Sequence, residues 1–149
     1  MTPVLYILMR TDLPSMNAGK AMAQASHASN AFIDMAKDDI HEERLALTKA
    51  WENETAQGFG TVLVLGCNGE QMRRIVADAR FKFLIAGMVT DPSYPYRVSG
   101  EVANIIYPNG GYDNTKEVTL VRNEQTCAFV FGDKDGLAGT VVAELRLHP

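Results

Sequence analysis

The hydrophobic positions of this chain gather in short runs that predict buried strands. Val4–Met9 and Thr61–Cys67 are almost continuously apolar, which is typical of strands covered on both faces. Leu84–Val89 is a similar run that ends at Asp91, and Cys127–Phe131 is another. We therefore expect strands at these positions.

Between these runs the apolar residues repeat at helical spacing. A first helix is expected from near Ala18, with a stripe of alanines against the sheet, and a second over residues 41–56. Asn68 and Gln71 are spaced as a capping box that begins a third helix, and a closing helix is expected after Gly136. Strands that alternate with helices predict an α/β layer structure. The apolar positions that carry these patterns are Ala21, Ala25, Ala28, Phe32, Leu47, Ala50, Trp51, Met72, Ile75, Val76, Ala79, Leu137, Val141 and Val142.

The segment from Pro92 to Gln125 interrupts this alternation. It contains three prolines, the sequence NGG, and two short runs that resemble strands, EVANIIY and KEVTLV. A hairpin or a lid is expected here, as an ordered excursion of the domain.

The composition indicates one soluble globular domain. The chain has 149 residues, of which 46% are hydrophobic and 21% are charged, and this length suits a single core. No apolar run approaches the roughly 20 residues of a membrane span, and the N-terminal run lacks a basic stretch before it. Neither a membrane segment nor an export signal is therefore expected. Cys67 and Cys127 lack the spacing of a zinc site or a disulfide framework, which favours a reduced, cytoplasmic setting.

Charge and motifs narrow the classes of function. The formal net charge of −4 argues against an extended nucleic-acid surface, while a local basic patch is compatible with it. The sequence NAGK resembles part of a phosphate loop, but the upstream glycine is missing and Ala21 replaces the hydroxyl that would hold magnesium. A nucleotide triphosphatase is therefore not expected. The GxSxG nucleophile motif and a GxGxxG after a strand are also missing.

Lys20 occupies an unusual position for a lysine. If Asn17 caps the first helix, Lys20 lies in its first turn, where the helix dipole is positive and a cation is unfavourable by roughly 0.3–1 kcal/mol. Lys20, Gln24 and His27 follow one another at i, i+4 and i+7, which makes a polar row beside the alanine stripe. Spacing alone fits either a solvated helix edge or a functional site.

Two segments resemble the signature of the type II peptidyl-tRNA hydrolases. RTDL (Arg10–Leu13) is similar to the end of the first strand of that family, and GKAMAQASHA (Gly19–Ala28) is similar to the start of its first helix. FVFGDKDGLAGTVVAELRL, near the C-terminus, resembles the last strand, glycine-rich turn and final helix of the family.

The resemblance implies a fold and a reaction. The fold would be a single compact α/β domain over residues 1–149, with a mixed four-stranded sheet, helices on both faces, and an inserted hairpin or lid at about 92–116. The protein would be a cytoplasmic homodimer that hydrolyses the ester between peptide and tRNA in peptidyl-tRNA, with no cofactor, metal or membrane. A second class of function is a catalytically altered domain of this fold that binds a peptide, nucleotide or protein.

The family places a lysine, a glutamine, an aspartate and a threonine at its site. Lys20 and Gln24 match directly, and Asp91 matches the aspartate at the end of the third strand. The family threonine follows its aspartate by four residues, but here PSYP follows Asp91. Thr119 corresponds to the threonine when residues are counted back from the glycine-rich turn, and Ser93 is the rival candidate.

Each of these residues has expected roles. Lys20 would bind the oxyanion or a tRNA phosphate, Asp91 would act as general base or orient Lys20, and Gln24 and Thr119 would position water or substrate. Asp91 has a simpler alternative as the cap of a turn before proline. The residues expected to contact substrate are Gly19, His27, Arg10 and Ser93. His27 is alternatively a packing histidine, and Arg10 is expected to pair with Asp12 and fix the loop before the helix.

Overall fold

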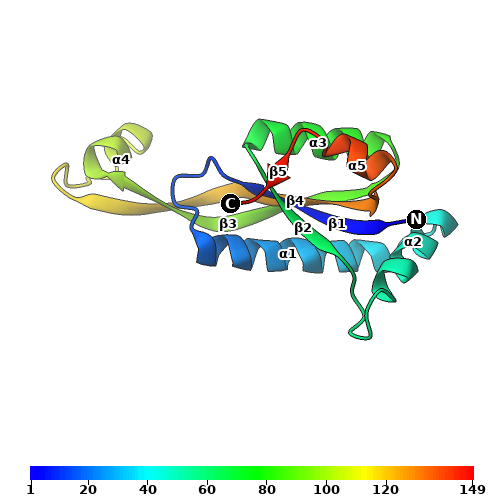
Figure 1. Ribbon diagram of the computed structural model, residues 1–149. Helices are drawn as coiled ribbons and strands as arrows, with labels where there is room; N and C mark the ends of the chain where they lie inside the picture. The colour runs from blue at the N-terminus through cyan, green and yellow to red at the C-terminus, as the bar shows by residue number, and fades with distance from the viewer. The chain divides into compact units, whose positions relative to one another are not determined.

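The central strand of the fold is β1 (Pro3–Arg10), which has neighbours of opposite direction on its two sides. It pairs in parallel with β2 (Val62–Cys67) and antiparallel with β4 (Glu117–Asp133). The computed structural model describes residues 1–149, and its sheet has the order β3-β4-β1-β2-β5 (Figure 1). The other elements are α1 (Ala18–Lys37), α2 (Glu42–Glu52), α3 (Gly69–Phe81), β3 (Ile85–Ser99), α4 (Gly100–Ile106), α5 (Leu137–Val141) and β5 (Arg146–Leu147).

Residues of β1 are buried alternately in two cores, as a strand covered on both faces requires. Tyr6 and Leu8 pack in the cluster that includes Met72 of α3, whereas Leu5 and Ile7 pack in the cluster that includes residues of α1 and α2. Figure 1 shows α3 and α5 on one face of the sheet and α1 and α2 on the other. The expected mixed sheet with helices on both faces is confirmed.

The sheet has five strands, where four were expected. The additional strand, β5, is short and pairs antiparallel with the outer edge of β2, with Leu147 opposite Leu65. A run of two residues is too short to produce a recognisable hydrophobic pattern, so only its pairing identifies it.

The helix starts follow the predicted caps. Asn17 accepts a 2.9 Å hydrogen bond from the backbone N–H of Lys20, and Asn68 and Gln71 form the expected capping box at α3. α2 is shorter than predicted because it ends at Glu52, before a turn in which Gly58 has a positive φ of 87°. Of the apolar positions that carried the helical patterns, Leu137 is 51% exposed, Ala25, Leu47 and Ala50 are half-buried, and the others are buried.

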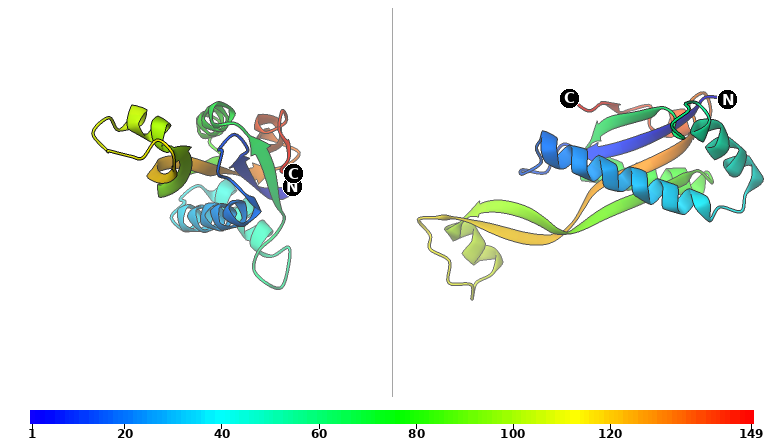
Figure 2. Two further views of the ribbon diagram at one scale, coloured as in Figure 1. Left: turned by 90° about the vertical axis from the view of Figure 1, so that its left-hand side faces the viewer. Right: turned by 90° about the horizontal axis from the view of Figure 1, so that it is seen from below.

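The chain divides into two compact units, residues 1–89 with 125–149, and residues 90–124. The second unit consists of the distal parts of β3 and β4 and of α4, which follows the end of β3 (Figure 2). In this unit β3 does not end at Asp91 as expected but continues through Pro92 to Ser99. Proline is tolerated in β3 because this strand lies at the edge of the sheet.

The run EVANIIY is helical, and its prediction as a strand was wrong. Ser99 accepts a 3.2 Å hydrogen bond from the N–H of Val102, and this cap begins α4. The run KEVTLV was correctly predicted as a strand, since it falls within β4. Within this unit the guanidinium of Arg122 lies 4.2 Å from the centre of the Tyr96 ring, and the Tyr96 hydroxyl donates to Glu124.

None of the helices combines the length and the apolar character that crossing a membrane requires. The two cysteines, Cys67 and Cys127, are buried and unpaired.

Candidate active site

Arg10, the last residue of β1, forms a bidentate ion pair with Asp12, and this pairing was predicted from the sequence. Its Nε and Nη2 atoms lie 2.9 Å from the two carboxylate oxygens of Asp12. Its Nη1 atom donates to the backbone oxygen of Gln125 at 3.1 Å. Arg10 thereby fixes the loop that leads from β1 to α1 and attaches it to β4.

This loop is also anchored to α3. The N–H of Gly69 donates to Asp12 at 3.3 Å, and a Cβ at Gly69 would lie 3.0 Å from the Arg10 guanidinium carbon, so glycine permits this close approach. The hydrogen bonds from Arg10 lower the pKa of Asp12 below its ordinary value, against the effect of burial, and Gly69 adds to the lowering. The loop before α1 is therefore held in place by charge-assisted bonds.

Lys20 lies in the first turn of α1, as expected, and its side chain folds back over the turn before it. The ammonium donates to the backbone oxygen of Ser15 at 2.9 Å, and the side chain is half-buried. The first turn of α1 contains no acidic residue. The interaction with the Ser15 carbonyl is one way in which the fold compensates for a cation at a positive helix end.

Gln24 lies one turn further along α1 and is almost fully buried, with 6% of its surface exposed. Its side-chain oxygen Oε1 accepts a 2.6 Å hydrogen bond from the hydroxyl of Thr126, and its backbone oxygen accepts one from the thiol of Cys127. Because Oε1 faces Thr126, the two N–H groups of the amide are directed away from β4. Gln24 is thus fixed in one orientation.

Thr126 was not among the residues that sequence reasoning selected. It has no exposed surface and begins the buried run of β4. A polar residue at the start of an apolar strand needs a hydrogen-bond partner, and this is the signal that could have identified it.

His27 and Gly19 are both exposed on α1. The interpretation of His27 as a packing histidine was therefore wrong, and the predicted polar row turns from half-buried Lys20 through buried Gln24 to exposed His27. A Cβ at Gly19 would meet nothing closer than an oxygen of Asn17 at 3.5 Å. The helix start could therefore accommodate a side chain there, so internal packing does not explain the glycine.

Asp91, Ser93 and Thr119 belong to the second unit. Asp91 is half-buried, and one of its carboxylate oxygens accepts a 2.9 Å hydrogen bond from the N–H of Ser93 and lies 3.4 Å from its hydroxyl. This is the local capping role that an aspartate before proline suggests. Thr119 is exposed on β4. The convergence of these residues with Lys20 stays a prediction.

His, Cys, Asp and Glu side chains form no group of three or more that could hold a metal ion. The groups that this region offers to chemistry are an ammonium, an oriented amide and the first backbone N–H groups of α1. Such groups bind and polarise anions and carbonyl oxygens.

The family model of peptidyl-tRNA hydrolase PTH2 matches residues 3–98. The chain therefore belongs to this hydrolase family, and the resemblance inferred from the sequence signature is confirmed. The matched segment contains Lys20, Gln24 and Asp91, and it ends before Thr119 and Thr126. No individual curated protein matches the chain.

Proposed function

We propose that this protein hydrolyses the ester bond between the peptide and the 3′ ribose of tRNA in peptidyl-tRNA, releasing free tRNA. The observation that carries the proposal is the arrangement at the start of α1, where Lys20 lies one turn before an immobilised Gln24 in a chain of the PTH2 family. The second function considered, partner binding by an altered domain, is not favoured by the family match.

Lys20 provides positive charge beside the backbone N–H groups of a helix start. Ester hydrolysis develops negative charge on the carbonyl oxygen, and the acceptor end of tRNA carries phosphates. An ammonium and helix N–H groups that point the same way suit either anion. We assign Lys20 to the oxyanion or to a phosphate, with Gly19 leaving the approach open and Arg10 holding the loop.

Gln24 supplies oriented donors. Oε1 of Gln24 accepts from Thr126, so the amide N–H groups lie at the other end of a group that is held in one orientation. A fixed donor stabilises a transition state without reorganisation during the reaction. Gln24 is therefore proposed as a catalytic residue and Thr126 as its positioning residue.

Asp91 is proposed as the general base or as the group that orients Lys20. Asp91 lies within residues 3–98, the segment that the family model matches, and it corresponds to the aspartate that the resemblance places at the site. Thr119 or Ser93 would assist in positioning water, and His27 would contact substrate from the exposed side of α1.

We propose a cytoplasmic homodimer that requires neither metal nor cofactor and contacts tRNA through a small area. The net charge of −4 supports a local contact at the acceptor end rather than an extended RNA surface. The segment 92–116 would serve as an ordered excursion beside the site.

The test uses purified protein and an N-acetylated aminoacyl-tRNA, with release of free tRNA measured in the presence of EDTA. Turnover is expected and should survive the chelator. Lys20→Ala should lower kcat/KM by at least about 100-fold, the scale of one lost transition-state donor. Its stability should change by less than about 0.5 kcal/mol, because relief from the helix dipole opposes loss of the bond to Ser15.

Lys37→Ala is the matched control, because Lys37 is an exposed lysine in the last turn of the same helix. It should keep full turnover and lose a few tenths of a kcal/mol of stability, since a cation is favourable at that end. A wild-type protein that binds the tRNA without cleaving it would contradict the proposal and support the altered-domain alternative.

A further inference from the structure

Phe83, in the turn between α3 and β3, holds an aromatic ring in solvent. Its side chain is 77% exposed, and its backbone φ of 60° is rare for any residue other than glycine. A bulky residue keeps such a conformation only where the surrounding structure imposes it. Because the ring packs little against its own chain, burial within the monomer does not explain this conformation.

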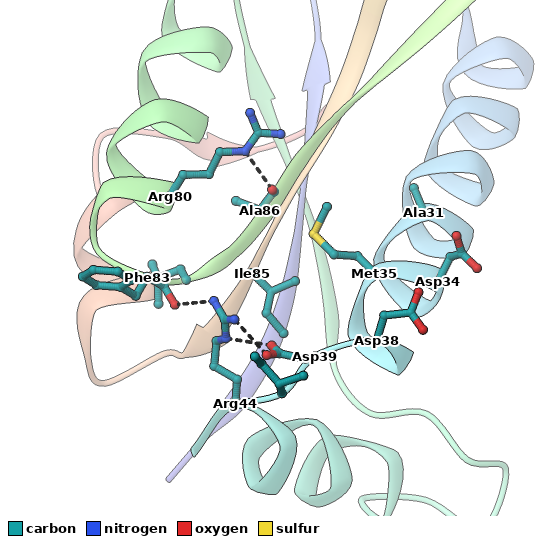
Figure 3. Close-up of a pocket in the computed structure, with 12 residues that line it drawn as sticks. Ala31, Asp34, Met35, Asp38, Asp39, Arg44, Arg80, Phe83, Ile85 and Ala86 are labelled. Atoms are coloured by element: carbon teal, nitrogen blue, oxygen red, sulfur yellow. Dashed lines mark hydrogen bonds and ion pairs between the residues drawn. The ribbon is translucent and has the colours of Figure 1, made fainter. Parts of the chain in front are cut away.

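Arg44 of α2 fixes the backbone of Phe83. Its Nη1 atom donates to the backbone oxygen of Phe83 at 3.1 Å, and its guanidinium binds both carboxylate oxygens of Asp39, at 2.7 and 2.8 Å. Figure 3 shows this backbone oxygen facing Arg44 while the ring of Phe83 extends away from it. The turn is thus tied to α2, and the ring is directed outward from a fixed backbone.

An apolar hollow of about 250 Å³ lies beside this ring. A dry apolar cavity of about 150 Å³ accommodates benzene, so the hollow has room for a phenyl ring. Phe83 lies at its margin, so a projecting ring and a hollow of matching size are neighbours on one surface. The apolar side chains that line the hollow are Leu47, Leu84, Ile85, Phe131 and Leu137.

The exposed apolar side chains around Phe83 have the extent that a protein interface needs. Ile40 is 85% exposed and Met35 44% exposed, and both line a larger hollow that Phe83 also borders. Leu137, at the smaller hollow, is 51% exposed. At about 200 Å² for a phenylalanine and about 130 Å² for each of the others when fully exposed, the four side chains present roughly 400 Å². A standard interface buries about 800 Å² on each partner, of which about 60% is non-polar. These four residues therefore provide most of the apolar area that one side of a stable dimer requires.

Charges of both signs border the smaller hollow. Glu43 is exposed in the first turn of α2, and Lys82 directly precedes Phe83. Lys82 donates to Asp78 at 2.9 Å, and its ammonium has further N–H groups for a second carboxylate. If Phe83 enters the hollow of another copy, Lys82 is brought to the margin where the partner's Glu43 lies. A two-fold axis makes this contact twice, so the surface is complementary to itself in shape and in charge.

We propose that a second copy of the chain docks on this surface, with each Phe83 ring inserted into the partner's hollow beside the partner's Leu137. The proposal names the interface of the homodimer put forward above, and it rests on that part of the proposed function. An isologous contact fits this surface because the ring and the hollow both belong to it. Ile40 and Met35 would pack around the inserted rings. None of these side chains is among those assigned to the reaction.

Sedimentation velocity of the purified protein, at micromolar concentrations and without substrate, tests the proposal. The wild type should sediment as a dimer. Phe83→Gly suits the positive φ and removes the ring, so it should fold. It should raise the dissociation constant of the dimer at least about 100-fold, because buried aromatic anchors dominate interfaces and the two-fold axis removes two of them. Phe59→Ala is the matched control, since Phe59 is an exposed aromatic residue that lines neither hollow, and it should sediment like the wild type.

Charge reversal tests the two-fold arrangement. Glu43→Lys alone should weaken the dimer about tenfold, because like charges then face each other at both contacts, and Lys82→Glu alone should do the same. An equimolar mixture of the two single variants should form mixed dimers with nearly the affinity of the wild type, since each subunit then meets the opposite charge on the other.

Four results would overturn the proposal. They are a wild type that stays monomeric at about 100 µM, a dimer whose affinity Phe83→Gly leaves unchanged, a mixture of the charge variants no tighter than either alone, and open assemblies that grow with concentration through head-to-tail contacts. Because substrate is absent, the outcome is separate from that of the reaction. An inactive protein that dimerises through Phe83 would refute the proposed hydrolysis and support this interface, whereas an active monomer would do the reverse.

Discussion

The hydroxyl of Thr126 donates a 2.6 Å hydrogen bond to Oε1 of Gln24, and neither residue has more than 6% of its surface exposed. The two residues lie on β4 and α1, and this bond decides which end of the Gln24 amide faces β4. The buried hydroxyl of Thr126 thus helps to hold a proposed catalytic residue in one orientation.

Thr126→Val should impair catalysis and stability together. Valine keeps the shape of threonine but leaves the Gln24 oxygen buried without its donor, which costs about 1–3 kcal/mol. Urea denaturation should show this loss, and kcat should fall while KM changes little, because the Gln24 amide is then held less firmly in the orientation that presents its donors. Thr126→Ser should restore most of kcat. A serine variant as slow as the valine variant would show that Thr126 acts through packing alone.

The proposed partnership of Lys20 and Asp91 can be tested by a double-mutant cycle on kcat/KM. Residues that act as one unit have strongly non-additive effects, so Lys20→Ala combined with Asp91→Asn should be little slower than the slower single variant. Glu101→Gln, in the same unit as Asp91 and exposed on α4, should combine additively with Lys20→Ala. Full additivity for the Asp91 pair would place the two residues in independent roles.

Asp12 should make part of the free energy of unfolding depend on pH in the acidic range. Its pKa is lowered in the folded protein, mainly by the hydrogen bonds from Arg10, so it stabilises the fold above its unfolded pKa of about 3.9. This contribution disappears as the pH falls through the lowered pKa. Asp12→Asn should therefore be less stable than the wild type at pH 7, and the difference should shrink below about pH 4.

Urea midpoints measured from pH 7 to pH 2 provide the comparison. In an Arg10→Ala background, replacement of Asp12 by asparagine should have a much smaller effect at every pH, because the main partner of the carboxylate is gone. An undiminished effect in that background would assign the stabilisation to Gly69 and α3 instead.

The two cysteines should be unreactive in the native state. Burial raises the pKa of both Cys67 and Cys127 to about 12, and the thiolate is the reactive form. Ellman's reagent at pH 8 should modify neither thiol until the protein is unfolded in urea, whereupon both should react. Rapid modification of either cysteine without denaturant would show that the strand bearing it opens locally.

The elements that were predicted correctly from the sequence are those that a few neighbouring residues determine. The apolar run of β1 and the capping box of Asn68 and Gln71 each determine a structure within a few residues. EVANIIY was misread because its valine and isoleucines favour strands, whereas the Ser99 cap and the buried Ala103 fix it as a helix. β5 depends on a distant partner, and no local pattern encodes it.

The residues of the candidate site also differ in whether a local sequence pattern could predict them. Lys20 and Gln24 lie within one short motif, so their spacing on a helix was predictable, and so was the pairing of Arg10 with Asp12. Thr126 was missed because its contact with Gln24 spans 102 positions of the chain. A hydrogen bond of that kind becomes visible only when β4 is placed beside α1.

The pairing of β1 also affects how the chain can fold. Its antiparallel partner is β4, with Pro3 opposite Asp133 and Met9 opposite Cys127. One edge of the central strand can therefore pair only after the residues of β4 have been synthesised. Contacts of such long sequence separation carry a large loop-closure entropy and slow the folding transition. During synthesis this edge of β1 therefore stays unpaired until β4 has emerged, so pairing across the centre of the sheet is expected to come late in folding.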